Sequence, residues 1–165
     1  MAPQTISRQE AEDFIIAEAE LLDEWKMPEW AKLFTQDARY EVTSPASTTP
    51  LTDRPESSLF LIADRIDRIE GRANRLMKSG THAEFPRSKT RHLVTNMRVR
   101  DGADGETNVR ANFAVYRTKE DTTTVYMGEY HYRLARENGA MKIRQKRCVL
   151  DINSLYDQGR LTIIL

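Results

Sequence analysis

The chain has 165 residues, of which 39% are hydrophobic and 30% charged, with 25 Lys and Arg against 25 Asp and Glu. This length suits one domain, residues 1–165, with its own hydrophobic core. No apolar run approaches the roughly 20 residues of a membrane span, and zero net charge argues against nucleic acid as the main partner.

The N-terminal residues have neither a basic start nor an apolar segment, so they do not resemble a secretory signal. The single cysteine, Cys148, cannot form an internal disulfide, which agrees with a reducing compartment. We therefore expect a cytoplasmic protein.

Charge is unevenly distributed along the chain. Residues 1–41 hold four Lys and Arg against ten acids, whereas residues 64–100 hold ten Lys and Arg against four acids. The simpler interpretation is that the two segments neutralise each other in the fold. The alternative is that the basic segment faces another subunit.

The first part of the chain predicts two helices. Ser7 and Glu10 form a capping box, and apolar residues at helical spacing predict an amphipathic helix over residues 8–24. Pro28 suits the first turn of a second helix that ends near Phe34. A short strand is expected at 38–42, and a loop with three prolines at 43–57.

Residues 59–63 are ambiguous between a strand and the start of a helix, whereas a helix is indicated from Asp64 onward. Apolar residues define one face of this helix, and arginines define an adjoining stripe: Arg65, Arg68, Arg72 and Arg75. Asp64 lies four residues before Arg68 and should support it. The stripe suits either a solvated face or a subunit interface.

Four consecutive strands are predicted at 89–100, 107–119, 122–136 and 140–153, joined by turns rich in Asp, Asn and Gly. They predict an antiparallel meander. One face of the second strand should be buried, because Val109, Ala111, Phe113 and Val115 alternate with polar residues. The first strand alternates Leu93, Thr95, Met97 and Val99 against a mixed set, His92, Val94, Asn96 and Arg98.

This element order resembles the α+β cone of nuclear transport factor 2, ketosteroid isomerase and scytalone dehydratase. The run from Trp30 to Tyr40, WAKLFTQDARY, is similar to the entry signature of that NTF2-like superfamily. The resemblance implies N-terminal helices packed in a strongly curved mixed, mainly antiparallel sheet. It does not fix a function, because the fold hosts enzymes and interaction modules alike.

A narrower resemblance lies in residues 86–99, PRSKTRHLVTNMRV, together with Leu51-Thr52-Asp53 and Asp64-Arg65-x-x-Arg68. These motifs resemble the small, or beta, subunit of aromatic-ring-hydroxylating dioxygenases, in which a segment of the form P-x-S-x-T-R-H-x-x-x-N-x-x-V opens the sheet. In length and element order the resemblance covers essentially the whole chain.

This second resemblance implies a multi-subunit oxidoreductase that takes part in the degradation of aromatic compounds. The larger alpha subunit would carry a Rieske [2Fe-2S] cluster and a mononuclear Fe(II), and three alpha and three beta subunits (α3β3) would assemble on a homotrimer of the beta chain. The beta chain would be structural. Arg91, His92 and Asn96 would fix their strand to its neighbours or to the partner subunit.

The residues of this chain support placing the chemistry elsewhere. A Rieske centre needs two cysteines and two histidines, but the chain has only Cys148. A facial iron site needs two histidines and a carboxylate, and the three histidines, His82, His92 and His131, lie in no recognised ligand motif. We therefore expect no catalytic, cofactor or metal residues here.

The alternative is a freestanding cone-fold dehydratase or isomerase with His92 or His131 as general base, assisted by Asp37, Tyr126 or Tyr130. Strand parity argues against convergence of these groups. It places His131 with Val125 and Met127, and the two tyrosines on the opposite face.

Parity also separates the basic residues around Cys148. Arg147 should lie with Ile143 and Val149, which makes it a candidate for a buried or interfacial ion pair, with Glu129 as a candidate partner. Cys148 is interpreted as a small packing residue.

Overall fold

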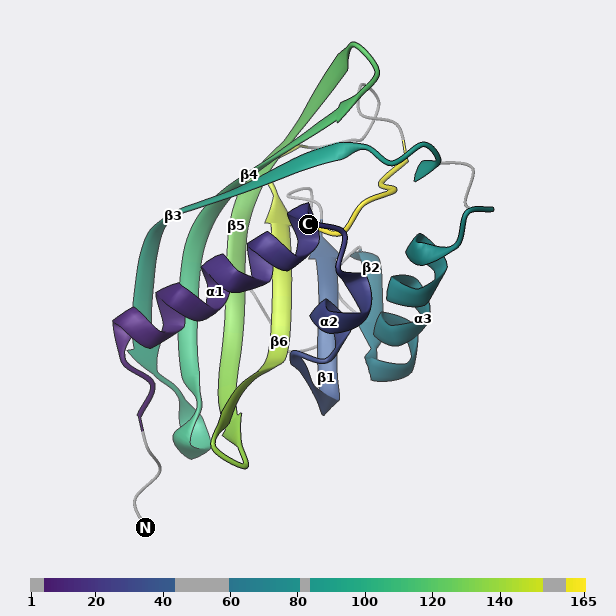
Figure 1. The fold of residues 1–165 in the computed structure, drawn as a ribbon. Coiled ribbons are helices and arrows are strands. Elements are labelled where there is room, and N and C mark those ends of the chain that lie inside the picture. Colours follow the sequence, from purple (N-terminus) through teal and green to yellow (C-terminus); the bar gives the residue numbers. More distant parts are fainter. Residues whose placement is uncertain (1–4, 44–59, 81–83, 153–159) are drawn as a thin grey trace.

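The computed structural model describes residues 5–43, 60–80, 84–152 and 160–165 (Figure 1). In the described residues, six strands form one mixed sheet, and three α-helices lie on one side of it. The helices are α1 (Arg8–Asp23), α2 (Met27–Ala31) and α3 (Ile66–Met77), and the strands are β1 (Phe34–Thr43), β2 (Phe60–Arg65), β3 (Lys89–Asp101), β4 (Thr107–Lys119), β5 (Thr122–Glu137) and β6 (Ala140–Leu150).

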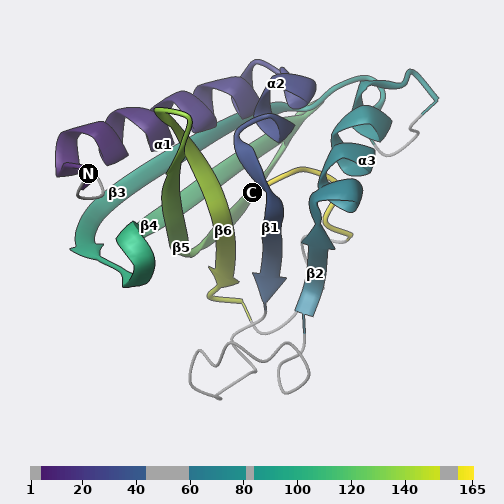
Figure 2. The same ribbon diagram turned by 90° about the horizontal axis from the view of Figure 1, so that it is seen from below.

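The strand order is β2-β1-β6-β5-β4-β3. Only the β1–β6 pairing is parallel, and the other neighbours are antiparallel. The predicted meander β3 to β6 is thus confirmed. The antiparallel pair β1–β2 extends the sheet beyond β6, because β1 pairs along the other edge of β6. Figure 2 shows how the sheet curves around α1, as expected for a cone-shaped α+β fold.

The sequence predicts the start of α1 correctly. Glu10 donates its backbone N–H to Ser7 Oγ at 3.3 Å, and the Ser7 N–H donates to the Glu10 carboxylate at 2.9 Å. These two bonds satisfy backbone donors that the first turn leaves open. The buried positions of α1, namely Ala11, Ile15, Glu18 and Leu22, follow helical spacing and face the sheet.

Several boundaries differ from the sequence-based expectation. The helix expected from Asp64 begins at Ile66, because Asp64 and Arg65 are the last residues of β2. The second helix ends at Ala31, and Phe34 already begins β1, which is longer than the predicted strand at 38–42. The ambiguous residues before Asp64 lie in the strand β2. This strand is stabilised by its pairing with β1, which its own sequence does not predict. Most of the expected proline-rich loop, from residue 44 to 57, lies outside the described residues.

A β-bulge changes the side-chain alternation of β3. In β3 the pairing with β4 shifts between Thr95 and Arg98, where Asn96 adopts a φ of 54°. Asn is among the residues that tolerate this left-handed conformation. The bulge brings Val94, Met97 and Val99 together on the inner face, so the predicted grouping of Met97 with Leu93 is wrong.

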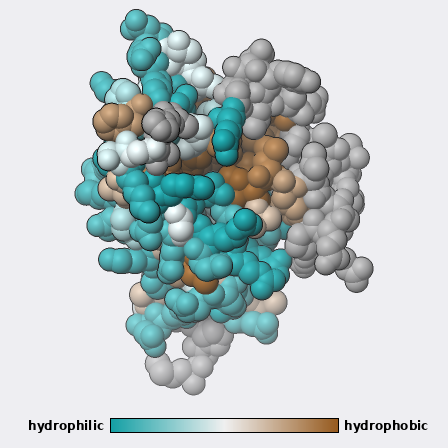
Figure 3. Space-filling model, turned by 90° about the vertical axis from the view of Figure 1, so that its right-hand side faces the viewer, coloured by the Kyte–Doolittle hydropathy of each residue, from teal (hydrophilic) through white to brown (hydrophobic). Residues whose placement is uncertain are grey.

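The inner face of the sheet, which faces α1, holds the core. The predicted buried residues of β4, Val109, Ala111, Phe113 and Val115, are at most 4% exposed. The C-terminal residues Ile163, Ile164 and Leu165 are also buried, and they end beside α2 and β1 (Figure 1). Seen from the side of α3, the surface is mainly hydrophilic, with one apolar area next to the undescribed residues (Figure 3).

Candidate functional site

The inner face of the cone is filled by large side chains. Trp30 packs edge-on against Phe34 and Tyr40, with ring centroids 4.8 and 5.5 Å apart, and Tyr130 stacks on Phe113 at 4.1 Å. The backbone N–H of Leu165 donates to the Tyr40 hydroxyl at 3.1 Å, so the C-terminal residues add to this packing. In enzymes of this shape, the corresponding space would have to receive a substrate.

A buried ion pair lies within this packing. Glu18 of α1 accepts from Lys146 Nζ at 2.7 Å, from the Tyr132 hydroxyl at 2.7 Å and from Trp30 Nε1 at 2.9 Å. Lys146 also lies 4.7 Å from the centroid of the Tyr130 ring. Both charged side chains are 1% exposed. Their hydrogen bonds compensate the loss of hydration, so the arrangement fixes α1 to β5 and β6.

His92 is engaged at both ring nitrogens. Its Nδ1 lies 2.5 Å from Asp23 Oδ1, and its Nε2 lies 2.9 Å from the carbonyl oxygen of Ile164. Both ring nitrogens are therefore engaged within the fold, and neither is free to take a proton from a substrate. Asp23 also accepts from the Thr90 hydroxyl and from the His92 backbone N–H, each at 3.0 Å.

These contacts decide the ionisation of Asp23. Burial alone would raise its pKa, but hydrogen bonds and charge from His92, with a further bond from Thr90, lower the pKa below its ordinary value. Asp23 is therefore a carboxylate under ordinary conditions. The cluster joins the end of α1, the start of β3 and the C-terminal residues.

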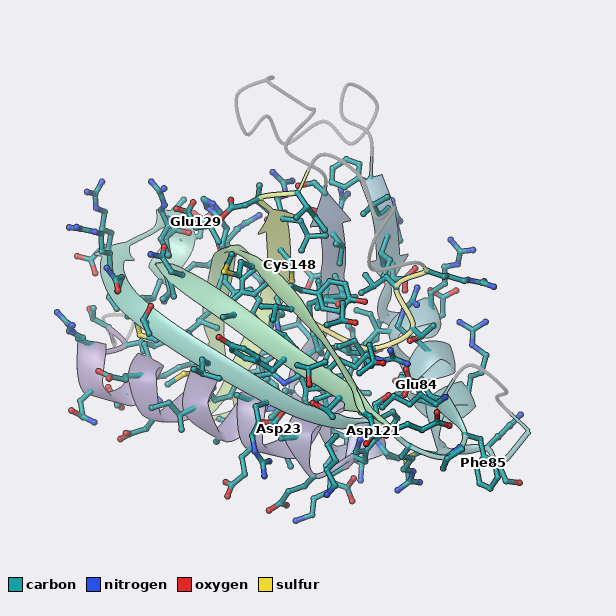
Figure 4. The ribbon with its side chains drawn as sticks, turned by 90° about the horizontal axis from the view of Figure 1, so that it is seen from above. Asp23, Glu84, Phe85, Asp121, Glu129 and Cys148 are labelled. Atoms are coloured by element: carbon teal, nitrogen blue, oxygen red, sulfur yellow. The ribbon has the colours of Figure 1, made fainter. Side chains whose placement is uncertain are left out.

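His131 lies on the outer face of the sheet, as parity predicts, while Tyr126 and Tyr130 are buried on the inner face. Its Nε2 is 2.5 Å from Glu129 Oε1, and Glu129 also binds Arg110 at 2.7 Å. Burial lowers the pKa of His131 more than Glu129 raises it. Figure 4 shows Glu129 and Asp23 on opposite sides of the sheet, so the two histidine clusters do not share a cavity.

The parts required by a dehydratase or isomerase therefore do not converge. Asp37 is exposed and hydrogen-bonded to Thr35 and, more loosely, paired with Arg144. Burial raises the pKa of Tyr130 well above its usual value, which keeps the phenol neutral. The arrangement does not favour the alternative enzyme.

Arg147 forms a buried ion pair, but not with the predicted partner. Its Nε donates to Glu41 Oε2 at 2.6 Å, across the parallel pairing of β6 with β1. The prediction of Glu129 is wrong because β1, and not only β5, borders β6. The bulge at Arg144 also places Ile143 on the inner face and Arg147 on the outer face, so these two residues do not lie together.

The predicted arginine stripe is divided. Asp64 pairs with Arg72 at 2.6 Å, and not with Arg68 as predicted. Arg68 is exposed, and Arg65 lies directly across from Arg39 in the β1–β2 pairing. Neither Arg65 nor Arg39 forms an ion pair with a described residue, and both line a polar cavity of about 710 Å³ on the outer side of the sheet.

Glu84 was not predicted as important, yet it organises one end of the sheet. It is 3% exposed and accepts from the Ser88 hydroxyl at 2.6 Å, from Arg117 Nε at 2.8 Å and from the Thr162 hydroxyl at 2.5 Å. Burial would raise its pKa, but these bonds, with Ser88 first, lower it. Its position outside any periodic segment gave no signal in the sequence. Glu18 did give one, since it falls on the apolar face of α1.

Within residues 5–43, 60–80, 84–152 and 160–165, no group of three or more His, Cys, Asp or Glu side chains could hold a metal ion. No helix in the described part of the chain is long and apolar enough to cross a membrane.

A curved, mainly antiparallel sheet with α1 against its inner face defines a cone-shaped α+β protein. Residues 17–157 match the family model described as "Ring hydroxylating beta subunit". The chain belongs to this family of ring-hydroxylating dioxygenase beta subunits.

Similar proteins agree with this assignment. The chain is 45% identical over 160 residues to the small oxygenase component of the p-cumate 2,3-dioxygenase system of Pseudomonas putida. The match covers 97% of this chain and 88% of the relative. Two solved structures share the fold. One is naphthalene 1,2-dioxygenase, with a TM-score of 0.82 and 17% identity, covering 96% of this chain and 85% of that one.

The second solved structure is the beta subunit of benzoate 1,2-dioxygenase from Burkholderia mallei. Its TM-score is 0.76 and its identity 23%, and the match covers 98% of this chain and 99% of that one. Membership of a beta-subunit family implies a larger oxygenase subunit as partner, and the iron chemistry belongs to that partner.

Proposed function

We propose that this chain is the non-catalytic, structural beta subunit of an aromatic-ring-hydroxylating dioxygenase, and that it supports assembly of the iron-bearing alpha subunits. The similarity to the small oxygenase component of the p-cumate system, over nearly all of both chains, carries this proposal. The packed inner face supports the non-catalytic role, because the side chains on this face pack against one another.

In the proposed complex, the alpha subunit holds a Rieske [2Fe-2S] cluster and a mononuclear Fe(II). The composition of this chain supports that division, since one cysteine cannot supply the ligands of a Rieske centre. Three alpha and three beta subunits assemble in the cytoplasm on a homotrimer of this chain. The substrate is an aromatic compound, and p-cumate is the first to test because of the relative's activity.

Within this proposal the predicted residues have different tasks. His92 and Asn96 shape β3 inside the subunit, through the bonds to Asp23 and through the bulge. Arg147 holds β6 to β1. Arg65, Arg68 and Arg91 lack ion pairs with described residues, which leaves their charges available to a neighbouring subunit.

Co-expression with the alpha subunit tests the proposal. A tagged alpha subunit should retain this chain through purification, and only the pair should show the Rieske absorbance, bound iron and turnover of an aromatic substrate with oxygen and reductant. If the alpha subunit is fully active and assembled without this chain, the proposal fails. Turnover by the isolated chain without iron, oxygen or reductant would instead support a dehydratase or isomerase.

A further inference from the structure

The outer face of the sheet, opposite α1, carries an exposed apolar patch. Leu93 on β3 pairs with Ala114 on β4, which pairs with Met127 on β5, and the next row holds Tyr116 and Val125. Leu93 is 46% exposed, Tyr116 41% and Met127 53%. We call these five residues the outer patch. Contiguous apolar groups of this kind mark interaction surfaces more often than scattered ones do.

The β3 side of the outer patch is basic. Arg91 precedes Leu93 by two residues on the same face, and Arg98 and Arg100 follow beyond the bulge. All three arginines are exposed, and none forms an ion pair with a described residue. The outer patch therefore has an apolar centre and a positive rim whose arginines form no ion pair with a described residue, although Arg91 shares a groove with Glu20 of the same chain.

A complementary surface lies on α1 of the same chain. Ile16 is 53% exposed, although its neighbours Ile15 and Leu22 are buried. Glu12, Asp13 and Glu20 surround it at helical spacing, and none of these acids forms an ion pair with a described residue. We call these four residues the acidic ridge. It has an apolar centre and a negative rim.

The ion pairs of the fold explain why both surfaces stay charged. Three N-terminal acids find their partners on β5 and β6, in Glu10–Arg136, Glu18–Lys146 and Glu41–Arg147, and Asp23 pairs with His92 on β3. Arg68, Arg91, Arg98 and Arg100 of the basic segment have no ion pair with a described residue. Mutual neutralisation of the two segments within one chain, the simpler interpretation of the charge pattern, therefore does not account for them.

We propose that the acidic ridge of one copy of this chain docks on the outer patch of the next copy. Ile16 contacts Leu93 and Met127, and the acids face the arginines of β3. Arg91 lies two residues, or about 7 Å, from Leu93, which is close to the four-residue distance, or about 6 Å, from Ile16 to Glu12 or Glu20.

The occupant is a second copy because one chain supplies both halves of the contact, with opposite charge and matching apolar centres. Such a contact joins two different surfaces, so repeated rotation can close a ring of three copies. The inference deepens the proposed function by naming the surfaces of the beta homotrimer, and it rests on that proposal.

Light scattering during size-exclusion chromatography tests the contact on the isolated full chain. The parent chain should have the mass of three copies. Ile16→Lys and Met127→Lys should each reduce the mass to that of one 19.1 kDa chain, because either places a cation in a buried apolar centre. Met77→Lys is the control, since Met77 is 38% exposed on α3 and outside both surfaces.

Mixing the two monomeric variants is the decisive step. The Met127→Lys chain keeps its acidic ridge, and the Ile16→Lys chain keeps its outer patch, so an equimolar mixture should form a heterodimer of two chains. Circular dichroism should show that each variant is folded. Charge reversals at Glu20 and Arg91 are not used, because these residues line one groove of about 400 Å³ within the same chain.

Several results would overturn the inference. They are a monomeric parent chain, trimers that persist in either variant, or a mixture that stays monomeric. Loss of alpha-subunit binding by a Met127→Lys chain that remains trimeric would assign the outer patch to the alpha subunit instead. In that case the inference fails while the proposed function stands, whereas an alpha subunit that never needs this chain contradicts the proposed function itself.

Discussion

His92 Nδ1 lies 2.5 Å from Asp23 Oδ1, although the two residues are 69 positions apart in the chain. The contact joins the end of α1 to the start of β3, and the other ring nitrogen of His92 joins both to the C-terminal residues through Ile164. A histidine whose two ring nitrogens are both engaged within the fold stabilises it and is not available for proton transfer.

His92→Ala should therefore lower the stability of the folded protein. The free energy of unfolding should fall by about 2–3 kcal/mol, because Asp23 loses a hydrogen-bond partner in a largely buried position. Urea denaturation followed by circular dichroism measures the change. Lys89→Ala, at an exposed position of the same strand, should change stability by less than about 0.5 kcal/mol. Equal stabilities of the two variants would contradict the role given to His92.

The stability of the fold should depend on pH in the acid range through Glu84. Its pKa is lower in the folded chain than the ordinary 4.5, so the folded state binds protons less readily than the unfolded state. The contribution of Glu84 is complete above the ordinary pKa and is lost as the pH falls through the folded-state value. Glu84→Gln should be less stable than the parent at neutral pH and should lose less stability on acidification to about pH 4.

Urea midpoints at the two pH values measure this difference. Asp23→Asn should behave in the same way, because the pKa of Asp23 is also lowered. Asp121→Asn is the matched control, since Asp121 is exposed in the turn between β4 and β5 and lies outside both proposed contact surfaces. If Glu84→Gln and the parent lost the same amount of stability, then Glu84 would not be a carboxylate held by Ser88 and Arg117.

The two charged residues in the core should show strong coupling. Lys146→Met leaves the Glu18 carboxylate buried without its cation, and we expect a loss of about 3–5 kcal/mol in the free energy of unfolding. The double variant Glu18→Gln with Lys146→Met removes both charges and should be more stable than Lys146→Met alone. A double-mutant cycle from urea denaturation gives the coupling energy. Additive effects would mean that the two charges do not interact.

Periodicity predicted this fold well where one face of an element is buried. The alternation in β4 and the helical spacing in α1 depend on their own sequences, and both predictions were correct. Pairing between distant strands could not be predicted in the same way. Glu41 replaces Glu129 as the partner of Arg147 because β1 lies parallel to β6, a neighbour that no local pattern specifies. Likewise, the bulge at Asn96 reverses the alternation of β3 midway.

The histidines of the candidate site show the same division. Parity alone placed His131 on the face opposite the buried tyrosines, which the structure confirms. The partners of His92 come from α1 and from the C-terminal residues, so its structural role depends on tertiary contacts. The motif in residues 86–99 was informative about the family without being a catalytic site.

Cys148 should resist thiol reagents in the folded protein. Its side chain is fully buried, burial raises the pKa of the thiol to about 12, and Sγ donates to the carbonyl oxygen of Leu165 at 3.8 Å. Labelling at mildly alkaline pH should therefore be slow in buffer and complete in urea. Ile164→Ala should raise the labelling rate at least about tenfold, since it weakens the packing of the C-terminal residues. Rapid labelling of the parent would contradict this burial.

Gly128 of β5 should not accept a side chain. A Cβ atom at this position would lie 2.0 Å from the carbonyl oxygen of Val149 and 3.0 Å from the Cα of Leu150, both on the paired strand β6. Because backbone atoms of a central strand cannot move aside, Gly128→Ala should lower the free energy of unfolding by about 1–3 kcal/mol or more. Gly71→Ala is the matched control, since nothing lies within 4 Å of its Cβ position in α3, and it should stabilise the protein by about 0.5–1 kcal/mol. Thermal denaturation of both variants measures these changes. A Gly128→Ala variant that melted at or above the temperature of the parent would contradict the close approach of β5 and β6.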